Sequence, residues 1–255
     1  MNLKGKTVLI TGGGSGIGLE AVKQFLANGS KVIITGRNQA KLDAAQRMYP
    51  SITAINSDVA SQDDAQALFD QVKALGGIDI LYNNAGVDSK PLKLGTPSEQ
   101  HFDDAANEIS INYLAVIRLN DLFMGMLKSR PEAAIINTTS IVSYQHLNLA
   151  PTYSASKAAA RFYTDALREH LSLIGSPIKV FEIAPPAVAT DMADGLVAKL
   201  MSPEKLVSIL IAGLKADNYR IRAGDAKAIY YLSRFFPRLA YKLVNTSQNN
   251  KALPA

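Results

Sequence analysis

The sequence feature that most constrains the fold is a regular alternation between short apolar runs and longer segments with helical periodicity. The first apolar run, TVLIT at Thr7–Thr11, has the length and composition of a buried strand. The other runs are Lys31–Thr35, Ile52–Asn56, Ile78–Tyr82, Ala133–Thr139 and Ile178–Ile183, and the first helices are expected to end near Asn28 and to span Gln39–Met48 and Gln62–Leu75. Alternating strands and helices favour a parallel sheet covered on both faces. We therefore predict an α/β fold with a single doubly wound sheet.

The length and composition are those of one globular domain. A chain of 255 residues with 47% hydrophobic residues can fill one large core. The sequence has no cysteine, which excludes disulfides and thiol catalysis, and its three histidines are scattered, so no metal site is expected. A strand begins at Thr7, which leaves no room for a signal peptide, and no apolar run reaches the ~18 residues of a membrane span. We expect a cytoplasmic protein.

A glycine-rich turn joins the first strand to the first helix. It reads TGGGSGIG, with a Gly-x-x-x-Gly-x-Gly spacing. Glycine lets the backbone approach a pyrophosphate closely, and the free N–H groups and dipole of the following helix stabilise its charge. A flexible loop is the alternative, but the position after the first strand favours a dinucleotide site. The expected cofactor contacts in this turn are Gly12, Gly14, Ser15, Gly16, Ile17 and Gly18.

The end of the second strand indicates which dinucleotide is bound. Dinucleotide sites that select NAD(H) usually carry an acid here for the ribose 2′-hydroxyl. This chain instead has Gly36 and Arg37, with Lys41 one helical turn further on. A guanidinium pairs bidentately with a 2′-phosphate and gains much less from a bare hydroxyl. We therefore expect NADP(H) to be preferred, with NAD(H) as the second option and a surface arginine that ignores the ribose as the alternative interpretation.

Tyr153 and Lys157 form a candidate acid–base pair. They lie four residues apart in an alanine-rich segment that favours a helix, so they share one helix face. A neighbouring ammonium stabilises a phenolate, which gives a tyrosine an acid–base role at neutral pH. The same spacing is common on ordinary helix surfaces, so the pair gains meaning only from the other motifs.

Together these motifs resemble the short-chain dehydrogenase/reductase family, in the family's order and over the whole chain. They are the glycine turn, Asp58-Val59, Asn83-Asn84-Ala85-Gly86, Asn112, Ser140 and Tyr153-x-x-x-Lys157. The segments Ala184–Met192 and Asp225–Arg234 are similar to the subgroup named after D-alanine esterification of teichoic acids. That name reflects gene context and implies no substrate. The resemblance implies a Rossmann-type sheet and an oxidoreductase activity.

The resemblance also implies a role for each catalytic candidate. Tyr153 would protonate the carbonyl oxygen as hydride arrives from nicotinamide, or act as base in the reverse direction, while Ser140 would hold that oxygen. Lys157 would bind the nicotinamide ribose and lower the tyrosine pKa, and Asn112 would help to hold a water for proton relay. Hydride addition builds negative charge on oxygen, which positioned hydroxyls stabilise. The alternatives are a backbone-bonded strand-end serine and a structural mid-helix asparagine.

The remaining cofactor contacts follow from the same resemblance. Asp58 and Val59 would flank the adenine, and Asn84, Ala85 and Gly86 would line the adenosine ribose and the path to nicotinamide. Pro185, Val188 and Thr190 would lie at the nicotinamide, with Val188 and Thr190 holding its carboxamide. The family usually has Pro-Gly where this chain has Pro185-Pro186. Since proline lacks an N–H donor, this chain departs from the family at that backbone contact.

The substrate is expected above the nicotinamide, beneath a lid formed by residues Asp191–Leu206. Gln145, His146 and Asn148 indicate a polar substrate unless they point to solvent, and His146 is more typical of a surface loop than of a catalyst. The expected wall consists of Ile141, Val142, Tyr144, Gln145, His146 and Asn148.

The C-terminal portion is strongly basic. Residues Tyr219–Lys251 contain seven lysines and arginines, one acid, Asp225, and interleaved aromatic residues. We expect residues 1–224 to form the catalytic domain, with the lid, and residues 225–255 to form a basic amphipathic helical extension packed on it and broken at Pro237. A helix lying on an anionic membrane is the less favoured alternative, because frequent aromatics usually find protein partners.

We therefore expect an NADP(H)-dependent oxidoreductase that transfers a hydride between nicotinamide and a small-molecule carbonyl or secondary alcohol. Family members usually form homo-oligomers, so we expect one here. Outside the C-terminal portion the basic residues are spread along the chain, so nucleic acid is not an expected partner. The alternatives are a non-catalytic NADP(H)-binding redox sensor and a membrane-surface binding protein. A sensor has no use for the phenol, so the intact Ser140, Tyr153 and Lys157 favour an enzyme.

Overall fold

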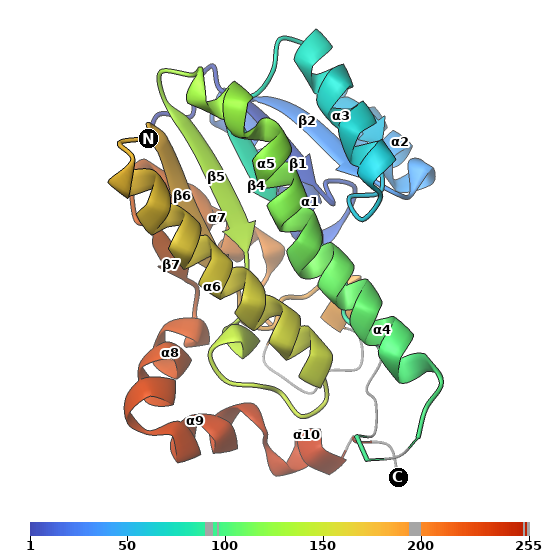
Figure 1. Cartoon of the computed structure of the whole chain (residues 1–255), viewed down its shortest axis with the longest axis vertical. Coiled ribbons are helices and arrows are strands. Elements are labelled where there is room, and N and C mark those ends of the chain that lie inside the picture. The colour runs from blue at the N-terminus through green and yellow to red at the C-terminus, as the bar shows by residue number, and fades with distance from the viewer. Residues whose placement is uncertain (90–93, 96, 194–199, 252, 254–255) are drawn as a thin grey trace.

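The computed structural model describes residues 1–89, 94–95, 97–193, 200–251 and 253, and these fold around one parallel sheet (Figure 1). Its seven strands lie in the order β3-β2-β1-β4-β5-β6-β7. Their bounds are β1 (Thr7–Thr11), β2 (Lys31–Gly36), β3 (Thr53–Asn56), β4 (Ile80–Asn83), β5 (Ala133–Thr138), β6 (Ile178–Ala184) and β7 (Arg220–Arg222). The prediction of a single doubly wound Rossmann-type sheet is confirmed.

Helices cover both faces of the sheet. The helices in the described residues are α1 (Gly16–Ala27), α2 (Gln39–Met48), α3 (Gln62–Ala74), α4 (Gln100–Ile109), α5 (Ala115–Lys128), α6 (Pro151–Leu173), α7 (Pro203–Lys215), α8 (Asp225–Phe235), α9 (Pro237–Val244) and α10 (Ser247–Lys251). Shorter turns are η1 (Ser110–Leu114), η2 (Ile141–Ser143) and η3 (Asp191–Ala193). Helices α1, α2 and α7 pack on one face, whereas α3, α5 and α6 pack on the other.

The strand sequences explain why two cores form. Successive side chains of a strand point to opposite faces, and in β1 both sets are apolar. Val8 and Ile10 join the core beneath α1 and α7, while Leu9 joins the core beneath α3 and α5. The continuous apolar runs seen in the sequence are therefore strands buried on both sides, as a parallel sheet requires.

The order of strands places a ligand-binding crevice at the carboxyl end of β1. From β1 the chain moves outward through β2 and β3, then returns to pair β4 with the other side of β1. Open α/β sheets bind ligands outside the carboxyl ends of their strands at such a switch point. The glycine turn follows β1 and the Asn84–Gly86 turn follows β4, so both lie at this crevice.

Strand β7 was not predicted from the sequence. It contains only three residues, and Arg220 and Arg222 flank the single buried apolar residue, Ile221. Such a short edge strand has no apolar run, because only one of its side chains enters the core. It pairs with β6 through Glu182, Ile183 and Ala184.

The last three helices lie beyond the carboxyl ends of the strands, at the lower end of Figure 1. Helix α8 ends at Phe235 and α9 begins at Pro237, so the break falls at the expected proline. No helix in the part of the chain that the structure describes is long and apolar enough to cross a bilayer. Nor do the described residues gather three or more metal-ligating side chains at one place.

Candidate active site

The glycine turn is a closely packed cradle at the N-terminus of α1. Gly12 and Gly16 have φ angles of +65° and +52°, in the left-handed region that glycine adopts without strain. A Cβ atom on Gly18 would lie 2.1 Å from the carbonyl oxygen of Gly12, so no larger residue fits there. Ser15 is the N-cap residue of α1, and its side chain makes no capping hydrogen bond. The turn therefore offers free helix N–H groups to an anion such as a pyrophosphate.

Thr11 ties this cradle to the turn after β4. Its side-chain oxygen accepts hydrogen bonds from the backbone N–H groups of Asn84 (3.0 Å) and Ala85 (2.9 Å). The side-chain amide of Asn84 donates in return to the carbonyl oxygen of Thr11, at 2.9 Å. The two motifs, more than 70 residues apart in sequence, thus form one rigid floor.

The candidate residues for 2′-phosphate recognition are Arg37, which follows β2, and Lys41, on the first turn of α2. The Arg37 side chain is 55% exposed, and its guanidinium lies 3.7 Å from the carboxylate of Asp58. The Lys41 amine lies 3.1 Å from the carboxylate of Asp191. Val59, next to Asp58, is buried, and its carbonyl oxygen accepts a hydrogen bond from Arg118 (2.8 Å).

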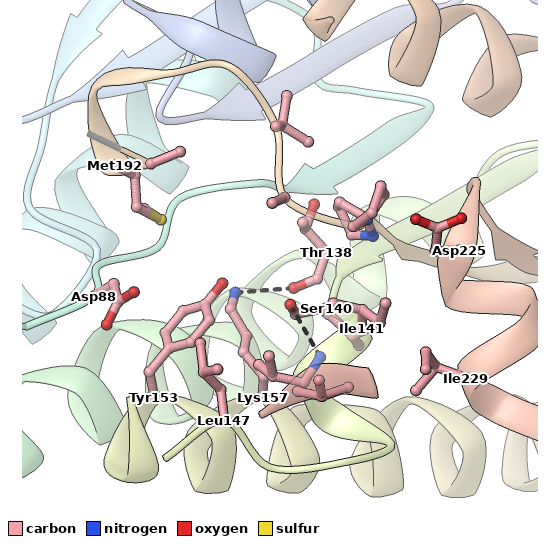
Figure 2. A pocket seen from close by; sticks show the side chains of 18 of the residues that line it. Asp88, Thr138, Ser140, Ile141, Leu147, Tyr153, Lys157, Met192, Asp225 and Ile229 are labelled. Atoms are coloured by element: carbon pink, nitrogen blue, oxygen red, sulfur yellow. Dashed lines mark hydrogen bonds between the residues drawn. The ribbon is translucent and has the colours of Figure 1, made fainter. Parts of the chain in front are cut away.

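Tyr153 and Lys157 lie on the first turns of α6, and Ser140 follows β5 (Figure 2). Pro151 occupies the first turn of α6, where its missing N–H costs nothing. The Lys157 amine lies 5.8 Å from the centre of the Tyr153 ring and donates a hydrogen bond to the carbonyl oxygen of Thr138 (3.0 Å). The Ser140 hydroxyl accepts a hydrogen bond from the N–H of Val142 at 3.4 Å. All three side chains enter one cavity.

Burial and nearby charges shift the pKa values of two members of this trio. Burial lowers the pKa of Lys157 to about 8, although Asp88 acts in the opposite direction. The pKa of Tyr153 is raised above its ordinary value, first by desolvation and then by the carboxylates of Asp88 and Glu108, while Ser140 acts to lower it. The net pKa of Tyr153 is therefore raised, because burying a phenolate beside carboxylates costs more than the Ser140 hydrogen bond returns, and the expected lowering by Lys157 stays a prediction.

Asn112 lies in η1, a turn of π-helix between α4 and α5. Its side chain bonds in both directions with the backbone of Val87, accepting at 2.9 Å and donating at 2.8 Å. It also donates to the Ser156 hydroxyl at 3.0 Å. These contacts join the loop after β4 to α6, and π-turns often occur at functional sites. Holding a water remains a prediction for this residue.

The cavity has a volume of about 580 Å³. Several residues expected to bind the cofactor line it together with the catalytic trio. They are Ile17, Asn84, Gly86, Pro185, Val188 and Thr190. Pro186, where the chain departs from the family pattern, also lines it. The rest of the glycine turn, Arg37 and Asp58 lie outside this lining, and Ala85 and Val59 border a much smaller pocket of about 10 Å³.

Comparison with known proteins decides the family. Residues 6–200 match the model of a family described as "short chain dehydrogenase".

The chain belongs to the short-chain dehydrogenase family.

The relatives support a full-length match to this family. The chain is 34% identical over 256 residues to "Uncharacterized oxidoreductase DltE" of Bacillus subtilis (strain 168), which covers 98% of this chain and 100% of the relative. This match confirms the resemblance to the subgroup named after teichoic acid D-alanylation.

Solved structures of the family share the fold. A short chain dehydrogenase from Burkholderia cenocepacia J2315 in complex with NADP has a TM-score of 0.84 at 23% identity, covering 96% of this chain and 100% of that chain. A short chain dehydrogenase/reductase from Burkholderia phymatum in complex with NAD has a TM-score of 0.82 at 21% identity, covering 94% and 97%. Other proteins with this fold therefore bind NADP or NAD.

Part of the expected substrate wall of this dehydrogenase is wrong. Ile141 and Val142 line the cavity, but the polar residues after them do not. Asn148 donates from its backbone N–H to the Asn245 side chain (2.7 Å) and from its amide to the Tyr241 hydroxyl (3.0 Å). His146 lies against the Tyr241 ring, with centroids 5.6 Å apart, and Gln145 lies 3.3 Å from the His146 ring nitrogen. Asn148 and His146 contact the C-terminal helices and Gln145 contacts His146, so these side chains give no indication of a polar substrate.

Tyr144, the other expected wall residue, is also turned away from the cavity lining. Its hydroxyl donates a hydrogen bond to the buried carboxylate of Glu182 at 2.9 Å, and its ring packs edge-on against Tyr230 of α8. It therefore helps to seat α8 on the sheet.

The expected lid is described only in part. Met192 and Ala193 line the cavity, and residues 194–199 lie outside the described residues. The two ends of the segment are joined, because Ala189 donates to Met201 and Met201 donates to Ala187, both at 2.9 Å. Leu206 belongs to α7 and is buried in the core, so that end of the expected lid is instead a fixed part of the fold.

Two acids in the site were missed by the sequence reasoning. Asp88 lines the cavity beside Tyr153 (Figure 2), and burial together with Glu108 raises its pKa to about 7. Glu108 is buried and accepts a hydrogen bond from the N–H of Ser89 at 2.7 Å. One oxygen of each carboxyl group has no partner among the described residues. The position of Asp88, two residues after the Asn-Asn-Ala-Gly motif, could have indicated a site residue. Its pairing with Glu108 is visible only in the fold.

Proposed function

We propose that this short-chain dehydrogenase is an NADP(H)-dependent carbonyl reductase, or an alcohol dehydrogenase in the reverse direction, with Tyr153 as general acid or base. The observation that carries the proposal is the meeting of Tyr153, Lys157 and Ser140 in one cavity that continues to the nicotinamide-side residues Pro185 and Thr190. The closely packed glycine cradle suits a dinucleotide, because it lies at the uncapped N-terminus of α1, and free helix N–H groups stabilise a pyrophosphate.

The cofactor, when bound, supplies the hydride, and the chain's own residues donate the proton and stabilise the negative charge that develops on the carbonyl oxygen. The hydroxyls of Ser140 and Tyr153 donate to the carbonyl oxygen as it gains negative charge. The raised pKa of Tyr153 keeps the phenol protonated at neutral pH, which suits proton delivery in the reductive direction. Lys157, anchored on the Thr138 carbonyl, keeps a positive charge beside the phenol.

We propose NADP(H) as the preferred cofactor, with NAD(H) as the second option. Support comes from Arg37, whose guanidinium is half exposed and only loosely paired with Asp58. Lys41 adds a second positive charge close by, on the first turns of α2. Two exposed cations at the end of β2 suit a phosphate better than a ribose hydroxyl.

We propose that the substrate has a mainly apolar body. The space beside the catalytic trio is enclosed by apolar side chains from four segments of the chain. They are Ile141, Val142, Leu147, Met192, Ala228, Ile229, Leu243 and Val244. Among the described residues, the charged side chains that line the cavity besides Lys157 are the acids Asp88 and Asp225, which disfavour an anionic substrate. An uncharged ketone or aldehyde with an aliphatic or alicyclic body fits this lining.

A paired substrate screen tests the proposal. Purified protein is mixed with NADPH and with carbonyl compounds matched in size, one set apolar and one set carrying hydroxyls or carboxylates, and NADPH absorbance is followed. We expect turnover with the apolar set and a higher KM, or no turnover, with the acids. Turnover restricted to polar or acidic carbonyls would contradict the substrate class. NADPH binding without turnover of any carbonyl would instead support the redox-sensor alternative.

We also propose a homo-oligomer. Support comes from large apolar side chains that are exposed on the neighbouring helices α4 and α6 and on the short η1 turn. They are Phe102, Leu114, Phe162 and Leu173. Exposed apolar side chains of this size on adjacent elements commonly mark a subunit interface. Light scattering on the purified protein measures the mass directly, and a monomer at all concentrations would contradict this assignment.

A further inference from the structure

The protein's excess positive charge is concentrated in its last helices. Residues 226–255 contain five basic residues and no acidic residue, and the net charge of the whole chain is +5. The first 225 residues are therefore electrically balanced. The five are Lys227, Arg234, Arg238, Lys242 and Lys251.

Helical spacing places most of these charges on the outer side of α8 and α9. In α8, Lys227, Tyr231, Arg234 and Phe235 recur at intervals of three and four residues, which defines one helix face, and all four are exposed. The opposite face buries Ala226 and Ile229.

Helix α9 continues this arrangement. Arg238, Leu239 and Lys242 are exposed on its outer side, whereas Ala240 is buried. We call the exposed residues of the two helices the C-terminal basic face. It consists of Lys227, Tyr231, Arg234, Phe235, Phe236, Arg238, Leu239 and Lys242.

Tyr231 of this face packs edge-on against Tyr230, but the two phenylalanines make no such contact among the described residues. Phe235 and Phe236, at the corner between α8 and α9, are 70% and 63% exposed, and neither ring packs against an aromatic ring of a described residue. Arg238 and Lys242 make no hydrogen bond or ion pair with the described residues. The face therefore combines unpaired cations with aromatic side chains that are left in water, which marks an interaction surface.

We propose that the C-terminal basic face docks on an anionic lipid bilayer, with Phe235 and Phe236 inserted among the headgroups. Basic residues are attracted to anionic headgroups, and aromatic side chains between them enter the interface. A second copy of the chain fits this face poorly. In a two-fold contact each copy presents the same surface, so the basic residues of one copy would face those of the other without acids between them.

Helices α8 and α9, which carry the C-terminal basic face, also line the candidate active-site cavity. Ala228 and Ile229 of α8 and Leu243 and Val244 of α9 line the apolar cavity. Docking would hold the cavity wall against the bilayer, where apolar carbonyl compounds dissolve. This consequence rests on the proposed function, whereas docking itself does not.

Vesicle co-sedimentation of the full-length protein tests docking. The probes are phosphatidylcholine vesicles with and without phosphatidylglycerol, at low and at high salt. We expect pelleting with the anionic vesicles at low salt and its loss at high salt, because surface charges are screened. The variant Arg238→Gln/Lys242→Gln should weaken partitioning roughly 25-fold, since each basic residue near an anionic surface strengthens binding about fivefold.

Matched controls separate the surface from net charge. Lys31→Gln/Lys73→Gln removes two exposed cations, one at the amino end of β2 and one in the last turn of α3, and should leave partitioning nearly unchanged. Phe235→Ser/Phe236→Ser should also weaken binding, whereas Leu75→Ser, an exposed apolar residue after α3, should not. Circular dichroism checks that each variant is folded.

Two outcomes would overturn the proposal. The first is equal pelleting with neutral and anionic vesicles, or equal losses in the test and control variants. The second is a change of molecular mass on Phe235→Ser/Phe236→Ser, measured by light scattering, with vesicle binding retained. The face would then be a contact between subunits. Neither outcome depends on NADPH turnover, so the proposed function is judged separately.

Discussion

At the scale of single residues, the behaviour of Tyr153 depends on acids that lie far from it in sequence. Asp88 comes from the loop after β4 and Glu108 from α4, yet both raise the pKa of the phenol. The same Asp88 carboxylate raises the pKa of Lys157, which burial lowers. The proton balance of the site is therefore set jointly by Asp88, Tyr153 and Lys157.

Replacement of Asp88 by Asn tests this coupling. The carboxylate disfavours the phenolate, so its removal should lower the Tyr153 pKa. Alcohol oxidation needs the deprotonated tyrosine and speeds up as pH rises. In Asp88→Asn this rise should therefore move to lower pH. The measurement is the pH dependence of kcat for oxidation with NADP⁺.

Asp225→Asn is the matched control for this experiment. Asp225 lines the same cavity but is not among the groups that shift the Tyr153 pKa. Its pH profile should stay at the wild-type position. A profile that moves equally in both variants, or in neither, would show that Asp88 does not control the acid–base group.

The proposed preference for NADP(H) over NAD(H) depends on Arg37. In Arg37→Asp the guanidinium is replaced by an acid that can accept a hydrogen bond from a ribose hydroxyl and repels a 2′-phosphate. The ratio of kcat/KM for NADPH to that for NADH should fall by roughly 10²-fold, since a hydrogen bond to a charged group is worth about 1.5–3 kcal/mol. An unchanged ratio would remove Arg37 from the cofactor site.

At the scale of secondary-structure elements, the C-terminal helices are held by a small polar clamp. The buried Asn245, which follows α9, accepts a hydrogen bond from the N–H of Asn148 (2.7 Å) and donates to the carbonyl oxygen of His146 (2.9 Å). Both partners lie in the loop between η2 and α6. The clamp therefore fixes α9 over the same cavity that the loop helps to form.

Asn245→Ala should loosen this clamp. The change leaves the N–H of the half-buried Asn148 and the C=O of His146 without this partner, which costs roughly 1–3 kcal/mol. The midpoint of thermal unfolding should fall by about 2–12 °C, and KM for apolar substrates should rise. Calorimetry and steady-state kinetics measure the two effects. Gln248→Ala, an exposed position without hydrogen bonds to the described residues, should leave both unchanged, and equal effects in the two variants would contradict the clamp.

The elements themselves were largely predictable from local sequence. Strand β1 and helix α2 have the predicted bounds, because apolar runs and helical periodicity are local signals. The clamp was not predictable, since its contacts join residues 97 and 99 positions apart. Without that contact, Gln145, His146 and Asn148 resembled a polar substrate wall. The direction of a loop side chain depends on which distant segment packs over the loop, and local sequence does not show that segment.

At the scale of the whole molecule, the doubly wound sheet explains why scattered motifs form one site. The glycine turn, Asn84–Gly86, Ser140 and Pro185–Thr190 each follow a parallel strand, so all lie at the carboxyl edge. This arrangement could be predicted because it follows from strand order and the motifs. The charge around Tyr153 could not, because the burial of Glu108 near it depends on the packing of α4 against α6.

The central claim is that Tyr153 moves the proton during hydride transfer, and Tyr153→Phe tests it most directly. Single-turnover reduction of an apolar ketone by NADPH is measured in the variant and the wild type, alongside NADPH affinity by fluorescence titration. The account predicts a fall in the rate of hydride transfer of about 10²–10⁴-fold, as for loss of a general acid, with NADPH affinity retained. A Tyr153→Phe protein that binds NADPH and reduces the ketone at close to the wild-type rate would contradict it.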